Sequence, residues 1–461
     1  MGVITKKTIM GMALVASLTL VLAIAITYLP LSNTSTQAFP FAPLWTQRSS
    51  AISNEGFIKN NILYDLILFS SRPSQLQTIG LYDSVYQINA INIQNDTSEW
   101  GSGYLVLNGS ARSGITAGVP HIYLEGNSIF VVGLTTNLLF EGQNLTAGSP
   151  PIPVFFIIQL NSNTGALIQI QSYPLPPNYY PDSFNYVQLN GTIYSVYATY
   201  SSTQASVLVA SSETLAQQKA NWSTNYTIPI SPGWGLGSDS LYVDSNYFVI
   251  ALGFGNGSVY VIDQSSGILL RELVPQGPGT PFTTIELFSS TTVANGSFFY
   301  VTRSINGFGI DRVPLKGGNI TGFSVFQGSP NNPPAYDFTS INDNLLVYYD
   351  QIISLCSETG SVLWSLNLSS VLVNRLGSSS TFDNPISFSN GAMLASVGTM
   401  SNTGTSFIGF VLVNETNGAA ILALSYYFSS SQQPNYQSIA SGDNYFVYYW
   451  NGYLVCSMIP K

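Results

Sequence analysis

Few residues in this sequence are of the types that carry out acid–base or metal chemistry. His121 is the only histidine, so a zinc site or a Ser-His-Asp triad would need that one ring. We interpret residues 119–123 as an inner β-strand and His121 as a structural residue. We therefore predict no catalytic residue, no metal ligand and no cofactor, and we favour a protein that is not an enzyme.

Two acidic segments contain oxygen atoms suited to Ca²⁺, at residues 95–99 and 239–244. Neither has the spacing of a helix-loop-helix calcium loop, so we interpret both as solvated turns. No glycine-rich phosphate motif follows a strand and opens a helix. The 13 basic residues form no cluster in a chain of net charge −9. These patterns argue against binding to nucleotides and nucleic acids.

Three connections combine proline-stiffened backbone with aromatic rings, at residues 173–181, 230–235 and 330–336. Aromatic side chains give contact area at a low cost in rotamer entropy, so such loops can stack on sugars or bind a protein partner. The alternative is that they only cover the faces of the fold. The candidate recognition residues are Tyr179, Tyr180, Trp234 and Tyr336.

The surface is predicted to be hydrated by uncharged groups. Only 8% of the residues are charged, against about 25% in an ordinary soluble domain. Acceptor triplets of the form N-x-[ST] occur along the whole chain and favour a glycosylated exterior. The candidate glycosylation sites are Asn95, Asn108, Asn144, Asn190, Asn221, Asn225, Asn256, Asn295, Asn319, Asn367 and Asn414.

The elements that carry these residues are repeats. Residues 343–349 (DNLLVYY) recur as residues 443–449 (DNYFVYY), and a similar start at residues 390–391 gives a period near fifty. Short alternating apolar runs with this period predict an all-β fold, a single β-propeller with one four-stranded blade per repeat. Eight openings suggest eight blades, with seven as the alternative: Asn61, Asn127, Asn190, Asn246, Asn295, Asn344, Asn390 and Asn444.

A second landmark is a turn that ends in glycine and is followed by an outgoing strand, at residues 161–165, 263–267, 356–360 and 414–418. The glycine supplies the positive φ of a tight hairpin with a bulge. Residues 257–270 and 356–366 resemble the repeat of the quinoprotein-like (PQQ-like) β-propellers, in which a tryptophan closes the outer strand. Trp364 matches that tryptophan. Arg271, Gln169 and Leu422 stand in its place elsewhere, so docking through tryptophan is not expected in the other units.

The resemblance has two further implications. Dehydrogenases of the family hold a quinone over Ca²⁺ on the ring axis, whereas other members bind no quinone and act as scaffolds. This chain has no adjacent cysteine pair, which favours a scaffold. The last unit also lacks its outgoing strand, and residues 43–47 look like an orphan one that carries Trp45. The two ends of the chain are therefore expected to share one blade, which removes open edges.

The two cysteines are predicted to be free. Cys356 and Cys456 occupy the same register in two blades that are not neighbours, and a disulfide needs Cα atoms within about 7 Å. We interpret both as small buried apolar residues.

The first residues predict a membrane-directed segment. Lys6 and Lys7 precede an uncharged apolar run over residues 9–29, long enough to cross about 30 Å of hydrocarbon as a helix. An uncleaved anchor and a cleaved signal peptide both fit, and in either case the body lies outside the cell. We divide the chain into a membrane anchor or signal segment (1–30), a Ser/Thr/Pro stalk (31–43) and the propeller (44–461).

These features predict an extracellular glycoprotein, anchored in the membrane or secreted, that binds partners or supports assembly at the cell envelope. An envelope protein or a glycan would be its partner, and the membrane would be a second one through an uncleaved anchor. The low charge predicts an acid-living, archaeal source. The alternatives are a quinone-dependent or carbohydrate-active enzyme, and a structural subunit of a surface layer or filament.

Overall fold

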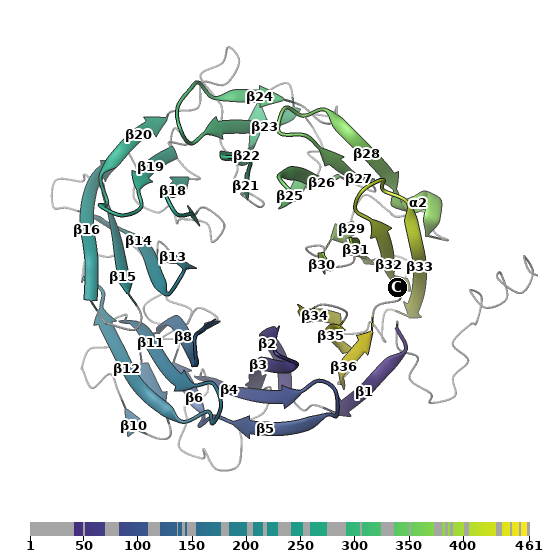
Figure 1. Cartoon of the computed structure of the whole chain (residues 1–461), viewed down its shortest axis with the longest axis horizontal. Helices are drawn as coiled ribbons and strands as arrows, with labels where there is room; N and C mark the ends of the chain where they lie inside the picture. The colour runs from purple at the N-terminus through teal and green to yellow at the C-terminus, as the bar shows by residue number, and fades with distance from the viewer. Residues whose placement is uncertain are drawn as a thin grey trace, which may run out of the picture.

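The chain forms a closed ring of eight β-sheets around a central axis (Figure 1). The structure is a computed structural model. It describes residues 41–48, 51–69, 83–108, 120–135, 137–140, 143–144, 154–176, 184–200, 206–214, 219–228, 241–251, 259–273, 292–304, 307–323, 336–349, 352–372, 380–382, 386–387, 391–400, 405–429, 436–442, 445–450 and 453–458. The predicted membrane segment and most of the stalk lie outside these residues.

Each sheet is one blade of a β-propeller, and the blades are numbered 1 to 8 around the ring. Blade 1 contains β2 (Ala51–Lys59), β3 (Ile62–Phe69), β4 (Asp83–Asn92), β5 (Thr97–Gly101), β6 (Leu105–Asn108), β9 (Asn137–Phe140) and β10 (Gln143–Asn144). Blade 2 contains β7 (His121–Glu125), β8 (Ser128–Thr135), β11 (Val154–Asn161) and β12 (Leu167–Pro174). Blade 3 contains β13 (Asn185–Leu189), β14 (Thr192–Tyr200), β15 (Ser206–Thr214) and β16 (Lys219–Ile228). Blade 4 contains β17 (Leu241–Val243), β18 (Tyr247–Ala251), β19 (Val259–Asp263) and β20 (Leu269–Leu273).

The second half of the ring follows the same plan. Blade 5 contains β21 (Thr292–Ala294), β22 (Ser297–Ser304), β23 (Gly307–Pro314) and β24 (Thr321–Phe323). Blade 6 contains β25 (Tyr336–Ile341), β26 (Asn344–Tyr349), β27 (Ile352–Cys356) and β28 (Val362–Asn367), and the one-turn helix α2 (Leu368–Val371) follows it. Blade 7 contains β29 (Ser380–Phe382), β30 (Ile386–Ser387), β31 (Ala392–Met400), β32 (Thr405–Asn414) and β33 (Ala420–Ser429). Blade 8 contains β34 (Tyr436–Gly442), β35 (Tyr445–Trp450), β36 (Tyr453–Met458) and β1 (Pro43–Arg48).

Where the structure describes them, the repeated openings are the first hairpin turns of the blades. Positive φ values between 45° and 70° occur at the pairs Asn60–Asn61, Asn190–Gly191 and Asn295–Gly296. Two consecutive residues of this kind make a type I′ turn, whose twist matches the flanking strands. The prediction of an eight-bladed propeller is confirmed, although blade 1 has seven strands and blade 7 has five.

Strands from both ends of the chain close the ring. β1 pairs antiparallel with β36, and Trp45 lies opposite Cys456. Blade 8 therefore takes its outer strand from the N-terminal side of the chain (Figure 1). This confirms the prediction that residues 43–47 complete the last blade. Both cysteines are free and buried, which agrees with the prediction.

Tryptophans on four outer strands dock on the next blade. The indole Nε1 atoms of Trp45, Trp100, Trp222 and Trp364 donate to backbone carbonyls of that blade at 2.8–2.9 Å. In the joints made by Trp100, Trp222 and Trp364, the indole ring covers a glycine of the next blade that has a positive φ. The expectation that units other than that of Trp364 do not dock through tryptophan was wrong for Trp100 and Trp222. The tryptophan position was located by its spacing from the glycine that ends the preceding turn. In blade 1 the residue with positive φ in that turn is Asp96, so this spacing rule missed Trp100.

Arg271 takes the tryptophan position in blade 4 and docks by hydrogen bonds. Its Nη1 donates to the Pro314 carbonyl at 2.7 Å, and its Nη2 donates to the Gly318 carbonyl of blade 5. The guanidinium has several donors in a fixed fork, so it can hold two carbonyls where an indole holds one. Blade docking therefore continues where the tryptophan is missing.

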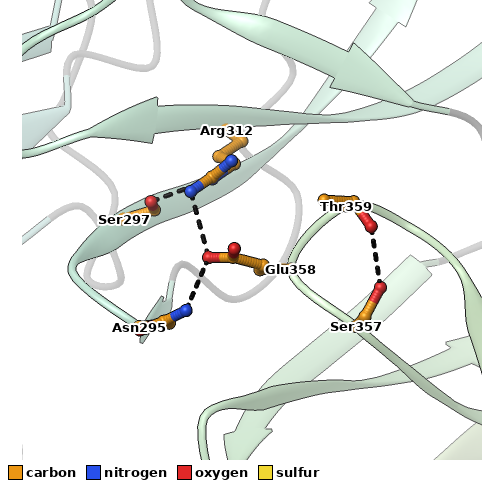
Figure 2. Close-up of polar contacts among 6 residues, drawn as sticks. All are labelled: Asn295, Ser297, Arg312, Ser357, Glu358 and Thr359. Atoms are coloured by element: carbon orange, nitrogen blue, oxygen red, sulfur yellow. Dashed lines mark hydrogen bonds and ion pairs between the residues drawn. The ribbon is translucent and has the colours of Figure 1, made fainter.

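The joint between blades 5 and 6 is polar (Figure 2). Glu358, in the last turn of blade 6, lies 3.0 Å from Arg312 Nη2 and accepts a hydrogen bond from Asn295 Nδ2 at 2.9 Å. Arg312 also donates through Nε to Ser297 at 2.9 Å. The contacts tie the first hairpin turn of blade 5 to the last turn of blade 6.

Blade 1 is extended by chain from two places. β5 and β6 pair with successive halves of β4, and the β9–β10 hairpin, which leaves blade 2, pairs with β6. Leu138 and Phe140 of this hairpin are buried in a core shared with blades 1 and 2. The hairpin therefore joins the two blades independently of the tryptophan contact.

Candidate functional site

The sole histidine lies on the innermost strand of blade 2, next to a carboxylate of blade 1. His121 Nδ1 is 3.2 Å from Glu55 Oε2, and the same oxygen accepts the backbone N–H of Ile122 at 3.2 Å. The side chains are 49% and 33% exposed. Because the carboxylate orients one ring nitrogen, the imidazole is presented to solvent in a fixed orientation.

An aromatic seam runs from this pair into the joint between blades 2 and 3. The His121 ring meets the Tyr186 ring edge-on at 5.6 Å, and Tyr186 donates its hydroxyl to the Val132 carbonyl at 2.8 Å. Phe155 lies 5.6 Å from Tyr186 and 4.9 Å from Phe184 between ring centroids. These separations are those of favourable aromatic pairs. We call the set His121, Phe155, Phe184 and Tyr186 the aromatic seam.

The tyrosines at the seam stay protonated. Burial is the main cause that raises the pKa of Tyr186 well above its usual value, and the negative charge of Glu55 adds to it. Burial and then the Glu55 charge also raise the pKa of Tyr123. Neither phenol therefore acts as a base at ordinary pH, and the chemistry that the seam offers is hydrogen bonding and stacking.

The seam anchors one of the predicted recognition loops. Leu175 is buried against Leu134, Phe184 and Tyr197, so the start of the connection over residues 173–181 is fixed. Tyr179, Tyr180 and Trp234 lie outside the described residues. Tyr336 begins β25, and its side chain is likewise outside them.

A half-buried carboxyl group, that of Glu213, lies farther along the same joint. The Tyr173 hydroxyl is within hydrogen-bonding distance of Gln171 and of Glu213 on β15. Burial raises the pKa of Glu213, and the Tyr173 hydrogen bond opposes that shift. Glu213 is therefore protonated more readily than an exposed glutamate.

Turn contacts occur in the described parts of both acidic segments, whereas Asp239 and Ser240 lie outside the described residues. Asn95 Oδ1 accepts the backbone N–H of Thr97 at 3.2 Å, and Asp244 Oδ1 accepts those of Asn246 and Tyr247 at 2.7 Å. Across the part of the chain that the structure describes, no three His, Cys, Asp or Glu side chains are grouped so as to hold a metal ion. Within the same residues, no helix has the length and apolarity to cross a membrane.

The candidate glycosylation sites lie at turns and on outer strands. Asn221 and Asn225 are exposed on β16, Asn367 is exposed at the end of β28, and Asn319 is exposed before β24. Asn95, Asn190 and Asn295 are exposed in turns, and Asn414 is half-buried. Asn108 and Asn144 lie in strands with side chains outside the description, and Asn256 lies outside it entirely.

Sequence reasoning singled out His121 but not its partner. Glu55 lies in another blade, and no local motif connects the two residues. The alternation of β2 and β7 places both on the inner row only once the blades are arranged in a ring. A search for charged residues on first strands of neighbouring repeats would have found the pair.

Comparisons with known proteins show distant likenesses in structure. No protein family and no curated protein matches the sequence. BamB from Moraxella catarrhalis is similar at 13% identity and a TM-score of 0.46, with 90% of this chain and 100% of that chain covered. The WD40 domain of SCAP from fission yeast is similar at 12% identity and 0.43, with 92% and 97% covered. The quinohemoprotein alcohol dehydrogenase of Comamonas testosteroni is similar at 10% and 0.35, with 89% and 66% covered. The order of the sheets itself establishes this chain as an eight-bladed β-propeller.

Proposed function

We propose that the protein is an extracellular glycoprotein, anchored in the membrane or secreted, whose propeller binds a protein or glycan partner at the cell envelope. The observation that carries this proposal is the aromatic seam, which holds the half-exposed His121 on the innermost strand of blade 2 and fixes the start of the Tyr- and Pro-rich connection. A rigid base lowers the entropy that a recognition loop loses on binding. Exposed acceptor asparagines on the outer strands support a glycosylated exterior.

We also propose that the chain is a PQQ-like propeller from an archaeal, acid-living cell. The glycine-ended turns covered by tryptophans of the preceding blade support the first part. The scarcity of charged residues supports the second, because a surface of hydroxyls, amides and sugars stays hydrated in acid.

A binding experiment tests the function. The full chain is applied to a glycan array and used to capture proteins from envelope extracts, beside the double variant Tyr179→Ala, Tyr180→Ala. We expect the variant to lose at least about tenfold in affinity, because aromatic anchors dominate such interfaces. Asn225→Gln, on an outer strand away from the seam, is the control and should bind normally. Retention of neither a glycan nor a protein by the parent chain contradicts the proposal.

If the cell lives in acid, as we propose, the propeller should stay folded at low pH. Burial raises the pKa of Asp96 and of Glu213, so these carboxyls bind protons more readily in the folded state. Protonation of these two carboxyls therefore raises the free energy of unfolding as the pH falls through their folded-state pKa values. Hydrogen bonds from Ser265 and Ser266 lower the pKa of exposed Asp263, so its contribution is present above its unfolded pKa and lost as the pH falls through its folded pKa.

These opposed effects predict a small net change in the free energy of unfolding, because the contacts of His121 with Glu55 and of Arg312 with Glu358 are partly exposed and worth little. The purified propeller should melt cooperatively at pH 3 as well as at pH 7, followed by circular dichroism. The variant Asp263→Asn should lose less stability than the parent chain between pH 7 and pH 3. A chain that is folded at pH 7 and unfolded at pH 3 contradicts the acid habitat.

A further inference from the structure

A bulge at the same place interrupts the outer strand of most blades. The register shifts one residue before the docking position in every blade except blade 5. A bulge leaves its extra residue unpaired and re-aims the side chain. The seven bulge residues are Leu44, Glu99, Ile168, Asn221, Leu270, Leu363 and Ile421.

Five of these bulge residues are large, apolar and about half exposed. The exposed fractions are 48% for Leu44, 51% for Ile168, 48% for Leu270, 55% for Leu363 and 51% for Ile421. The two others are polar, namely Glu99 and the glycosylation candidate Asn221. Single exposed apolar residues are common on protein surfaces, but their repetition in one register of five blades singles out the perimeter as a candidate contact surface.

A flat partner can touch a ring only over neighbouring blades. Adjacent blades both carry an apolar bulge residue at two places, blades 6 and 7 (Leu363 and Ile421) and blades 7 and 8 (Ile421 and Leu44). The position of the apolar segment favours blades 7 and 8. Residues 9–29 are uncharged and apolar, and the chain that follows them enters the ring at β1 of blade 8. The predicted stalk, residues 31–43, limits the distance between blade 8 and the preceding apolar segment to about 45 Å.

Charge favours the same pair of blades. Among the described residues of blades 7 and 8 the charged side chains are Arg48 and the buried Glu415, and Met458 adds a further exposed apolar side chain. Blade 6 carries Asp343 and Glu358 among its charged residues. Lipid contact removes water from the protein surface, which costs little where few charges lie.

We propose that the propeller stands edge-on to the membrane, with Leu44 of blade 8 and Ile421 of blade 7 resting in the lipid interface. This inference rests on the proposed membrane anchor. Burial of these apolar side chains at the boundary between headgroups and acyl chains strengthens membrane binding beyond that of the anchor. The orientation leaves the blade 2–3 seam, on another part of the ring, free to bind its partner (Figure 1).

The test measures the depth of single positions in full-length protein reconstituted into phosphatidylcholine vesicles. An environment-sensitive fluorophore is attached after Leu44→Cys, Ile421→Cys or Leu270→Cys, and nitroxide-bearing lipids are the quenchers. Leu270 is the matched control, because it occupies the same bulge in blade 4 and has the same exposed fraction as Leu44. The native thiols are buried and their pKa values are raised to about 11 for Cys356 and about 12 for Cys456, so they should not react.

We expect lipid quenching several-fold stronger at positions 44 and 421 than at position 270, with unchanged melting of all three variants. Equal quenching at the three positions overturns the orientation. A label at 421 that is shielded from aqueous iodide without being quenched by lipid also overturns it and indicates a second copy or another protein there. A full chain that does not float with vesicles overturns the anchor itself, and the orientation with it.

Discussion

Deleting residues 43–50 is expected to lower the free energy of unfolding by more than about 4 kcal/mol, the scale of removing a buried tryptophan from a core. The deletion removes β1, which supplies the outer strand of blade 8 and pairs with β36 from Ser457 to Tyr453. It also removes Trp45, whose indole donates to the Ile93 carbonyl of blade 1 at 2.8 Å. The ring would lose a strand and the joint between its last and first blades together.

Thermal melting followed by circular dichroism checks this prediction. Deleting residues 31–40 is the matched control, because it shortens the stalk by a similar length and leaves β1 in place. The single variant Trp45→Ala should lose part of the stability that the deletion loses. If the deletion melts at the temperature of the parent chain, closure by β1 does not hold the ring together.

Local turn chemistry is what made this fold predictable. Several Asn-x openings favour left-handed backbone, and Asn60, Asn190 and Asn295 have it. Each opening marks one hairpin whatever the rest of the chain does, so counting them counts the blades. The closing strand was predictable for a similar reason, since a repeat that lacks one strand at the end and has one to spare at the start has one simple solution.

Partners across blades were not predictable in this way. The strands alternate similarly, so nothing local says that β9 pairs with β6 or that Glu55 reaches His121. Trp100 and Trp222 were missed as docking residues because their own turns lack the usual glycine landmark. The ring geometry, and not the single repeat, decides which side chains of the candidate site meet.

Gly418→Ala is expected to cost about 3–4 kcal/mol of stability, the sum of strain at a left-handed residue and disruption of a buried contact. Gly418 has a φ of +70°, and a Cβ atom there would lie 2.5 Å from Cε3 of the Trp364 ring. The indole would have to move, and its hydrogen bond to the Glu415 carbonyl at 2.8 Å would be lost. Blades 6 and 7 would then separate at their outer joint.

The control separates backbone strain from the loss of docking. Gly296 has a φ of +67° and nothing within 4 Å of an added Cβ atom, so Gly296→Ala should cost only the strain of about 1–2 kcal/mol. Chemical denaturation of the two variants beside the parent chain measures the difference. Equal losses at the two glycines would mean that the Trp364 contact contributes nothing, and blade docking would then have to rest on the apolar core between the sheets, where Leu355, Val411 and Val413 pack together.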